Sequence, residues 1–383
     1  MNIYNKPLKF INLDDIHWKG NKLLSLGKDI NIAISGRIPG KTTFFNIMLY
    51  RQWYEKNRRF VMLTRLQVDV SDSMIDDIAK TINKFLPADS RIKLVFSKGN
   101  LKNGICDVYC YPEDSTATLF STDEDHLFFR VIALSTPIDR IKKAHMVPNC
   151  EWFFFDEFTV SKKLGGKYLP YEAEIFDQVY NTYYRESKHL RCIFCGNPYS
   201  KYNPYTAWFK MNLKDIKIGN IYTGDKWAIE YIKISPELRQ WVIDHNGLLD
   251  LISEEEQMFN LEGESIEDDN IVIVENEPKN MRLAYLFKLN GKILGVYKFD
   301  MSAKIDFEID PWYWIKMMPN DYNTTRRHIA CFNAYDLCTG VKMHNRKEST
   351  RFDNLCRAYR NYAIAYNSLE AASYFEEIYE YIS

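Results

Sequence analysis

The chain has 383 residues, with 50 Lys and Arg against 51 Asp and Glu, and its formal net charge is −1. Hydrophobic residues make up 46% of the chain and aromatic residues 15%, which excludes a disordered chain, and the length predicts two domains. A protein that permanently coats nucleic acid is usually basic overall, so any nucleic-acid contact here is expected to be local or transient.

The N-terminal sequence, the length of the apolar runs and the spacing of the cysteines indicate the cellular compartment. The N-terminal residues lack the apolar core of a signal peptide, and no apolar run has the length of a membrane span. Eight cysteines are scattered along the chain, and Cys192 and Cys195 form a Cys-x-x-Cys pair inside a strand-like run. Buried free thiols are therefore expected, rather than a metal or redox site. These features predict a protein of the reducing cytosol without a membrane partner.

The segment Ile32–Thr43 indicates an apolar strand, a tight loop and the start of a helix. In such a loop the backbone N–H groups point at a phosphate chain, Lys41 reaches the β- and γ-phosphates, and the Thr42 hydroxyl binds Mg²⁺. The common pattern has glycine where this chain has Ser35, and Gly36 follows one position late, so the loop entry should differ in geometry. A plain strand–turn–helix with a surface lysine is the alternative. The residues expected to contact a nucleotide are Ser35, Gly36, Arg37, Ile38, Pro39, Gly40, Lys41, Thr42 and Thr43.

Strand and helix patterns alternate after this loop. The strands are apolar throughout, which is typical of a mainly parallel sheet covered by helices on both faces. Ligands of such sheets bind beyond the carboxyl ends of the strands. The expected helices are 42–56 and 71–85, and the expected strands are 60–64, 94–97, 107–111, 131–134, 151–155 and 191–194.

One of these strands ends in two acids, within the run Trp152–Glu157. Asp156 is expected to hold Mg²⁺ through water, and Glu157 to take a proton from the water that attacks the γ-phosphate. Strand alternation should send the two carboxylates in different directions. A strand that merely ends in two solvated acids is the alternative.

The next strand ends in Gly196-Asn197-Pro198. Asn197 at this position could hold the attacking water or sense the γ-phosphate, and an ordinary Gly-Asn-Pro turn is the alternative. Hydrolysis also needs positive charge at the γ-phosphate in the transition state. Arg185 is the first candidate because it follows a predicted helix beside the sheet edge, and Arg140 and Arg37 are the others. A solvated surface arginine is the alternative for each.

The pattern changes between residues 212 and 269. Signals for the start of a helix occur at Ser235 and at Ser253, and the acidic run Glu262–Asp269 follows them. Together they predict a small helical linker. Strand signals then return, with a hairpin across Asn290-Gly291 between 283–289 and 292–299. The other expected elements are strands 271–274, 304–309 and 328–332 and a helix over 354–381. The domains are therefore predicted as 1–211, 212–269 and 270–383.

With the three motifs in this order, the first domain resembles the ATPase domain of viral DNA-packaging motors. These belong to the additional-strand, catalytic-glutamate (ASCE) P-loop ATPases, and the likeness is to the packaging ATPases of φ29-like tailed phages. Ser35–Thr42, Phe153–Glu157 and Gly196–Pro198 carry it. The resemblance implies that Arg185 is an arginine finger, and that Lys143 lies in a small lid, senses the neighbouring subunit and is one of the nucleotide-binding residues.

The same family pairs this ATPase with a C-terminal α+β domain of RNase H-like nuclease type, which is degenerate in φ29-like motors. A two-metal nuclease needs several carboxylates that converge on its ions. The hairpin 283–299 has none at its centre, and Asp306, Glu308 and Asp310 are better explained as a solvated strand edge. The resemblance therefore implies a vestigial, nuclease-inactive domain that docks on the procapsid or grips DNA.

The function that the resemblance implies is ATP hydrolysis with Mg²⁺ in a homo-oligomeric, pentameric ring. The ring would move double-stranded viral DNA through the portal of a preformed procapsid in the host cytoplasm, and a packaging RNA is a candidate further partner. A helicase-like or DNA-transfer ATPase with the same core is an alternative. So is a non-catalytic assembly protein that binds nucleotide.

Overall fold

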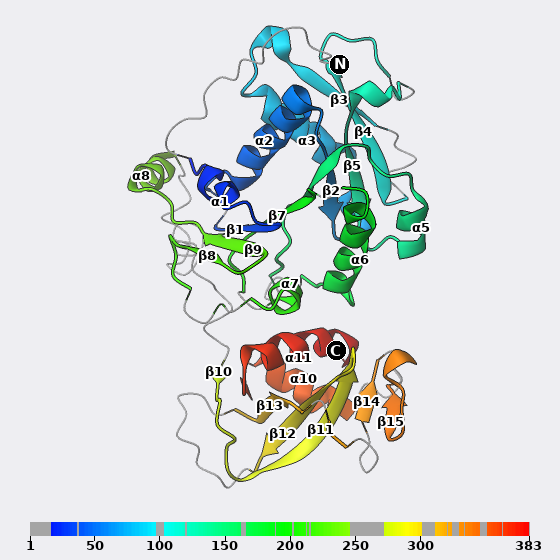
Figure 1. The fold of residues 1–383 in the computed structure, drawn as a ribbon. Helices are drawn as coiled ribbons and strands as arrows, with labels where there is room; N and C mark the ends of the chain where they lie inside the picture. The colour runs from blue at the N-terminus through cyan, green and yellow to red at the C-terminus, as the bar shows by residue number, and fades with distance from the viewer. Residues whose placement is uncertain are drawn as a thin grey trace. The chain divides into compact units, whose positions relative to one another are not determined.

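The computed structural model divides the chain into two compact units, and Figure 1 shows the course of the chain. The first unit comprises Met1–Val160, Glu172–Tyr199 and Asn212–Ile266, and the second Ser161–Tyr171, Ser200–Met211 and Glu267–Ser383. The second unit thus includes two segments that the sequence placed in the first domain. The structure describes residues 17–36, 38–96, 103–118, 121–161, 166–187, 189–200, 203–211, 213, 216–245, 272–300, 311–319, 321–323, 329–332, 334–344, 351–361 and 363–382.

The first unit is built on a nine-stranded sheet of order β3-β4-β5-β2-β6-β7-β1-β9-β8. Neighbouring strands from β5 to β9 are parallel, and antiparallel pairs occur only at the two ends. The predicted mainly parallel sheet is therefore confirmed, and β7 lies as an additional strand between β1 and β6. The strands are β1 Ile30–Ile34, β2 Arg59–Thr64, β3 Ile92–Phe96, β4 Ile105–Pro112, β5 Leu127–Ala133, β6 Cys150–Phe155, β7 Arg191–Gly196, β8 Ile221–Thr223 and β9 Trp227–Tyr231.

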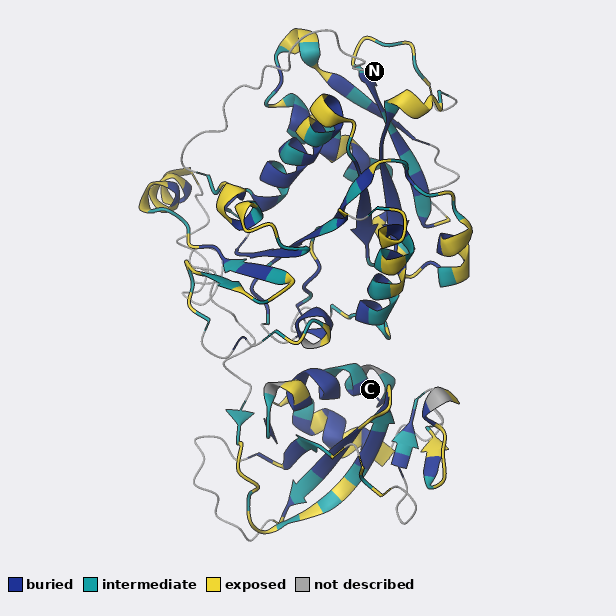
Figure 2. Ribbon diagram, in the orientation of Figure 1, coloured by how far each residue is buried: buried dark blue, intermediate teal, exposed yellow. Residues whose placement is uncertain are grey.

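Helices cover both faces of this sheet because the side chains of consecutive strand residues point to opposite faces. Phe154 of β6 packs against Phe45 of α2, with ring centroids 6.0 Å apart. Phe153, one residue earlier, packs against Phe176 of α6 on the other face, at 6.4 Å. Figure 2 shows the central strands buried between these layers. The helices of this unit are α1 Asn21–Ser25, α2 Lys41–Lys56, α3 Asp72–Asn83, α5 Ile138–Lys143, α6 Glu172–Tyr184 and α8 Pro236–His245.

The predicted helical linker over 212–269 is wrong for residues 221–231, which form the antiparallel pair β8 and β9. Strand β9 pairs in parallel with β1 and so extends the sheet of the first unit. Its five residues carry a weak signal by themselves, and pairing with an already buried strand decides their conformation. The helix expected from Ser235 is present as α8, whereas the expected helix from Ser253 and the acidic run lie outside the described residues.

The second unit holds a seven-stranded sheet of order β10-β16-β13-β12-β11-β14-β15. The predicted hairpin is confirmed as β11 and β12, and both turn residues have positive φ, 50° at Asn290 and 76° at Gly291. Asn-Gly is favoured in such two-residue turns for this reason. The strands are β10 Val272–Ile273, β11 Met281–Leu289, β12 Lys292–Phe299, β13 Tyr313–Met317, β14 Ile329–Cys331, β15 Val341–Met343 and β16 Ile364–Tyr366.

The predicted continuous helix over 354–381 is wrong, because β16 interrupts it. Helix α10, Asp353–Arg360, precedes this strand, and helix α11, Leu369–Ile382, follows it. Another helix of this unit is α7, Pro204–Trp208. The residues of β16 are buried and pair with β13, which outweighs their weak helical pattern. The expected strand 304–309 with Asp306, Glu308 and Asp310 lies outside the described residues, and the RNase H-like assignment stays a prediction.

Two further features concern the cysteines and the helix lengths. Cys192 and Cys195 are buried on β7 as free thiols, as expected, and burial raises the pKa of both well above the usual value. Within the described part of the chain, no helix combines the length and the apolar character needed to cross a bilayer.

Candidate active site

The loop that follows β1 has the geometry of a phosphate cradle. Gly40 has φ 84°, a left-handed conformation that favours glycine, and α2 begins at the next residue. The His17 ring lies 3.3 Å from the position that a Cβ atom at Gly40 would occupy, so the space is also restricted. The Trp18 N–H donates to the carbonyl oxygen of Pro39 at 3.2 Å. These contacts shape the loop at the N-terminus of a 16-residue helix, where an anion is favoured. Arg37 lies outside the described residues.

Lys41 is folded back onto the entry of this loop. Its Nζ donates to the Ser35 carbonyl oxygen at 2.9 Å, to Ser35 Oγ at 2.5 Å and to the Gly36 carbonyl oxygen at 2.9 Å. Burial lowers the pKa of Lys41 to about 8, against the opposing effect of nearby carboxylates. Ser35, the residue that departs from the common pattern, is itself buried and supplies two of the three acceptors. The unusual serine is thus explained as a ligand of the lysine ammonium.

Asp156, directly after β6, lies next to the start of α2. The Thr42 hydroxyl donates to Asp156 Oδ2 at 2.9 Å, so the two predicted metal ligands lie together. Burial raises the pKa of Asp156 to about 6, and the hydrogen bond from Thr42 opposes this shift. A partly buried carboxylate with a raised pKa, paired with a hydroxyl group, is a typical candidate for a functional site.

Glu157 turns away from its neighbour. It has φ 55°, a left-handed conformation that is uncommon for glutamate, and its side chain is exposed. Its N–H donates to Asp156 Oδ1 at 3.1 Å. The Asp156 carboxylate accepts a hydrogen bond at the start of α2, whereas the Glu157 side chain is exposed, so the two adjacent acids have different surroundings.

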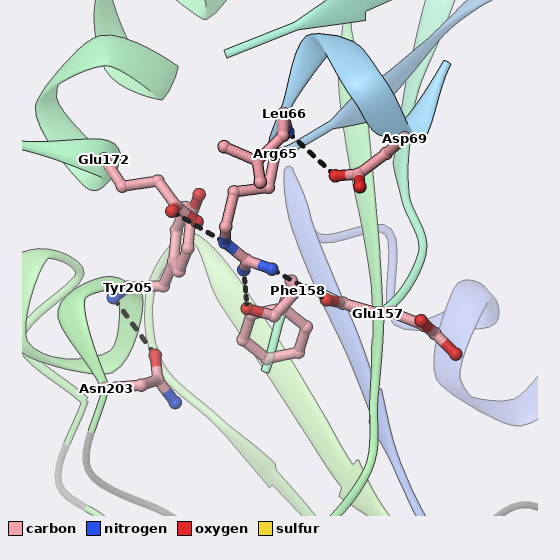
Figure 3. A network of polar contacts seen from close by, with 8 residues as sticks. All are labelled: Arg65, Leu66, Asp69, Glu157, Phe158, Glu172, Asn203 and Tyr205. Carbon is pink, nitrogen blue, oxygen red and sulfur yellow. Dashed lines mark hydrogen bonds and ion pairs between the residues drawn. The ribbon is translucent and has the colours of Figure 1, made fainter. Parts of the chain in front are cut away.

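Arg65, at the end of β2, links three parts of the site edge, as Figure 3 shows. Its Nε donates to Glu172 Oε2 at 2.8 Å, and its Nη2 donates to the Phe158 carbonyl oxygen at 2.6 Å. In Figure 3 the Glu157 carboxylate points away from Arg65. The guanidinium thus holds the backbone beside Glu157 and the start of α6. The sequence predicted a strand over 60–64 and gave no role to Arg65, the next residue, because its partner is 107 positions away.

Asn197 lies at the end of β7, next to the turn that follows β6. Its N–H donates to Thr159 Oγ1 at 2.9 Å, and the Thr159 hydroxyl donates back to the Asn197 carbonyl oxygen at 2.9 Å. A Cβ atom on Gly196 would lie 2.7 Å from both the Phe158 ring and the Thr159 hydroxyl. Glycine at 196 therefore permits the close approach of the two strand ends, and the Gly-Asn-Pro segment is more than a surface turn.

The exposed Arg185 lies at the opposite end of the parallel strands from the phosphate loop. It directly follows α6, which starts beside Arg65 at the loop edge. Near the end of α6, the Tyr180 hydroxyl donates to the Leu190 carbonyl oxygen at 3.3 Å, just before β7 begins. The C-terminal end of α6 is therefore at the amino ends of the strands. Arg185 does not lie at the phosphate loop of its own chain.

Lys143 also lies away from that loop, exposed on α5. It follows β5, and β2, β6 and β7 separate β5 from β1, which is four strand spacings or about 19 Å. With Arg140 it lines a cavity of about 500 Å³ beside β4. The other lining residues are Asn103, Ile105, Asp107 and Ala144.

Comparison with known proteins decides the family. The model of the family described as Podovirus DNA encapsidation protein (Gp16) matches residues 120–380, more than half of the chain. The chain belongs to this family. The matched region includes β6 with its two acids, β7 and most of the second unit. The resemblance inferred from the motifs is therefore confirmed.

Individual relatives agree with this membership. The DNA packaging proteins of Bacillus phage PZA and Bacillus phage phi29 are each 27% identical to the chain over 166 residues, which is 43% of this chain and 48% of theirs. The chain thus spans about half the length of the curated relatives it matches.

Two solved structures share the fold. The Phi-28 gp11 DNA packaging motor has a TM-score of 0.64 and 12% identity, covering 97% of this chain and 99% of that chain. The bacteriophage Phi-29 viral genome packaging motor assembly has a TM-score of 0.57 and 18% identity, covering 96% and 100%. At these identities, the likeness establishes the fold.

Proposed function

We propose that this chain is an ATP-driven motor that translocates double-stranded viral DNA into a preformed procapsid. The observation that carries the proposal is the convergence of a phosphate loop and an acidic strand end, with Thr42 Oγ1 2.9 Å from Asp156 Oδ2. Such a pair suits hydrolysis of a nucleoside triphosphate. Family membership then suggests the work that this hydrolysis drives.

The residues present fit Mg²⁺ bound to a nucleotide. Mg²⁺ prefers hard oxygen ligands and is usually held by one or two carboxylates together with water and substrate phosphates. Here the Thr42 hydroxyl and the Asp156 carboxylate would hold it. Mg²⁺ would neutralise charge on the β- and γ-phosphates. The ion would also favour the ionised form of Asp156, whose pKa burial raises.

The chain's own groups have distinct tasks in this proposal. Lys41 leaves Ser35 and donates to the phosphates, which replace its three present acceptors. Glu157 accepts the proton of the attacking water, since its carboxylate is exposed next to the site. Asn197 holds that water from the end of β7, where the hydrogen bonds to Thr159 fix its backbone.

The distances of Arg185 and Lys143 from their own loop support action on a neighbour. In a homo-oligomeric ring, proposed as a pentamer, Arg185 of one subunit would stabilise charge at the γ-phosphate of the next. Lys143, with Arg140 beside it, would approach the nucleotide of a neighbour through the surface of α5. The proposed further partners are the portal of the procapsid and a packaging RNA, with the second unit as a nuclease-inactive docking or DNA-binding part.

Glu157→Gln tests the hydrolytic assignment. The variant should bind ATP and lose turnover, while Glu113→Gln, an exposed acid at the end of β4, should leave both unchanged. ATPase activity is measured with and without double-stranded DNA and procapsids. Turnover at the normal rate in the Glu157 variant would show that Glu157 is not the general base. Turnover in the unchanged protein that ignores both DNA and procapsids would contradict a packaging motor.

Mixing subunits tests the role of Arg185. Rings that combine Arg185→Ala subunits with Lys41→Ala subunits should recover part of the ATPase activity that each variant alone lacks. The recovery is expected because an intact phosphate loop in one subunit then meets an intact arginine from its neighbour. Absence of any recovery across mixing ratios would rule out action between subunits.

A further inference from the structure

The sheet order indicates where the nucleoside part of a bound nucleotide lies. Asp156 and Asn197 follow β6 and β7, which lie on one side of β1, so the terminal phosphate of the proposed nucleotide would face that side. The nucleoside would then leave the phosphate loop on the other side of β1. The neighbouring strand on that side is β9, and helix α8 follows it in the chain.

Helix α8 is packed directly against the phosphate loop. Leu238 and Val242 on α8 are 1% and 5% exposed, and they form an apolar cluster with Ile38 of the loop and Ile234. Residues three and four apart lie on one face of a helix, so this face is the anchored one. The packing holds the helix at a defined place relative to the loop.

The same helix presents a large exposed aromatic ring. The Trp241 side chain lies between these two anchors in sequence and is 46% exposed. His245 stacks on it with ring centroids 4.6 Å apart and an interplanar angle of 18°. His17 meets it edge-on at 6.3 Å, and the same His17 ring lies 3.3 Å from the position that a Cβ atom at Gly40 of the phosphate loop would occupy. The exposed indole is therefore one side chain away from the phosphate loop.

We propose that Trp241 is the platform on which the base of the nucleoside triphosphate stacks. This inference rests on the proposed nucleotide binding at Lys41 and adds the recognition of the base. An indole offers a flat apolar face to any base. His245 stacks on one part of the ring, and the 46% of Trp241 that stays exposed offers the remaining surface to a base. Stacking does not read the hydrogen-bonding edge of a base, so ATP and GTP should bind with similar affinity and better than UTP.

The test separates the base from the phosphates. Binding of ATP and of inorganic triphosphate, both with Mg²⁺, is measured by calorimetry for the unchanged protein, Trp241→Ala and Trp241→Phe. Trp241→Ala should weaken ATP binding by about fivefold or more, the lower end of what a base–aromatic stack contributes, and leave triphosphate binding unchanged. Trp241→Phe should retain most of the ATP affinity. Ile243→Ala, which removes another exposed apolar side chain of α8, is the matched control and should change neither.

Each other outcome overturns the proposal. Equal ATP affinity of the unchanged protein and Trp241→Ala would show that the base does not use the indole. Equal weakening of ATP and inorganic triphosphate would show that Trp241 supports the loop instead of the base. If the unchanged protein bound neither ligand, the proposed nucleotide site itself would be wrong, and the platform with it.

Discussion

Replacing Arg65 tests whether the end of β2 depends on a buried ion pair. The Arg65 side chain is 12% exposed and that of Glu172 is 0% exposed, with 2.8 Å between Nε and Oε2. Arg65→Met keeps an unbranched side chain but leaves the Glu172 carboxylate buried without this cation. Removal of one partner of a buried pair costs about 3–5 kcal/mol, because the remaining charge stays desolvated.

Replacing Glu172, the other member of the ion pair, provides a check on this prediction. Glu172→Leu also breaks the pair, and the Arg65 guanidinium that remains keeps its bond to the Phe158 carbonyl oxygen. The double variant removes both charges of the pair, so its free energy of unfolding should exceed that of Arg65→Met alone. A surface pair supplies the control. Lys80 and Asp77 are 71% and 69% exposed, so Lys80→Met should leave the free energy of unfolding nearly unchanged.

Urea unfolding followed by tryptophan fluorescence measures these differences, provided that the m-value is the same for all variants. A loss of less than about 1 kcal/mol for Arg65→Met, equal to that of the surface control, would refute the reasoning. So would a double variant whose loss equals the sum of the two single losses, because the pair would then carry no coupling.

Three further predictions concern single side chains. Gly196→Ala should lower the free energy of unfolding by about 1–3 kcal/mol, because the new Cβ would lie 2.7 Å from the Phe158 ring; an unchanged thermal midpoint would contradict this. Burial raises the pKa of Asp156 from 3.8 to about 6, so its ionisation destabilises the fold as pH rises through this interval. With EDTA present, Asp156→Asn should therefore be more stable than the unchanged protein at pH 7, by on the order of 2 kcal/mol, and equal to it near pH 4. If Asp156→Asn were less stable than the unchanged protein at pH 7, desolvation of the Asp156 carboxylate would not destabilise the fold. Tyr374→Phe should destabilise the second unit by about 1 kcal/mol in thermal unfolding, because the Tyr374 hydroxyl donates to a buried strand carbonyl oxygen at 2.5 Å. No change would mean that water replaces this bond.

The parts of the site that the sequence predicted depend on short stretches of chain. The apolar runs before the loop and before Asp156 are short and rich in β-branched or aromatic residues, which favours buried strands. Gly40, Lys41 and Thr42 are adjacent, and their spacing already implies the loop geometry. The hairpin across Asn290-Gly291 is equally local, because the turn residues select the positive φ angles that it needs.

The errors fall where neighbours decide the conformation. Strands β9 and β16 have five and three residues, too few for a periodic signal, and each forms by pairing with a buried strand. A helical pattern around residues 364–366 was therefore misleading. Whether Arg185 lies at the amino or the carboxyl ends of the strands depends on the direction in which α6 crosses the sheet. The helical periodicity of the sequence does not reveal this direction.

The sequence by itself determined the chemistry available to this protein, namely a lysine and a hydroxyl at the start of a helix and two acids at the end of a strand. Tertiary structure decided how these groups meet. It brought Thr42 to Asp156 across 114 positions and Arg65 to Glu172 across 107, and it placed β7 between β6 and β1. It also placed Ser35 on Lys41 and Trp241 beside the loop. Local propensity acts over a few residues, whereas these contacts depend on strand order, which only the packing of the whole sheet determines.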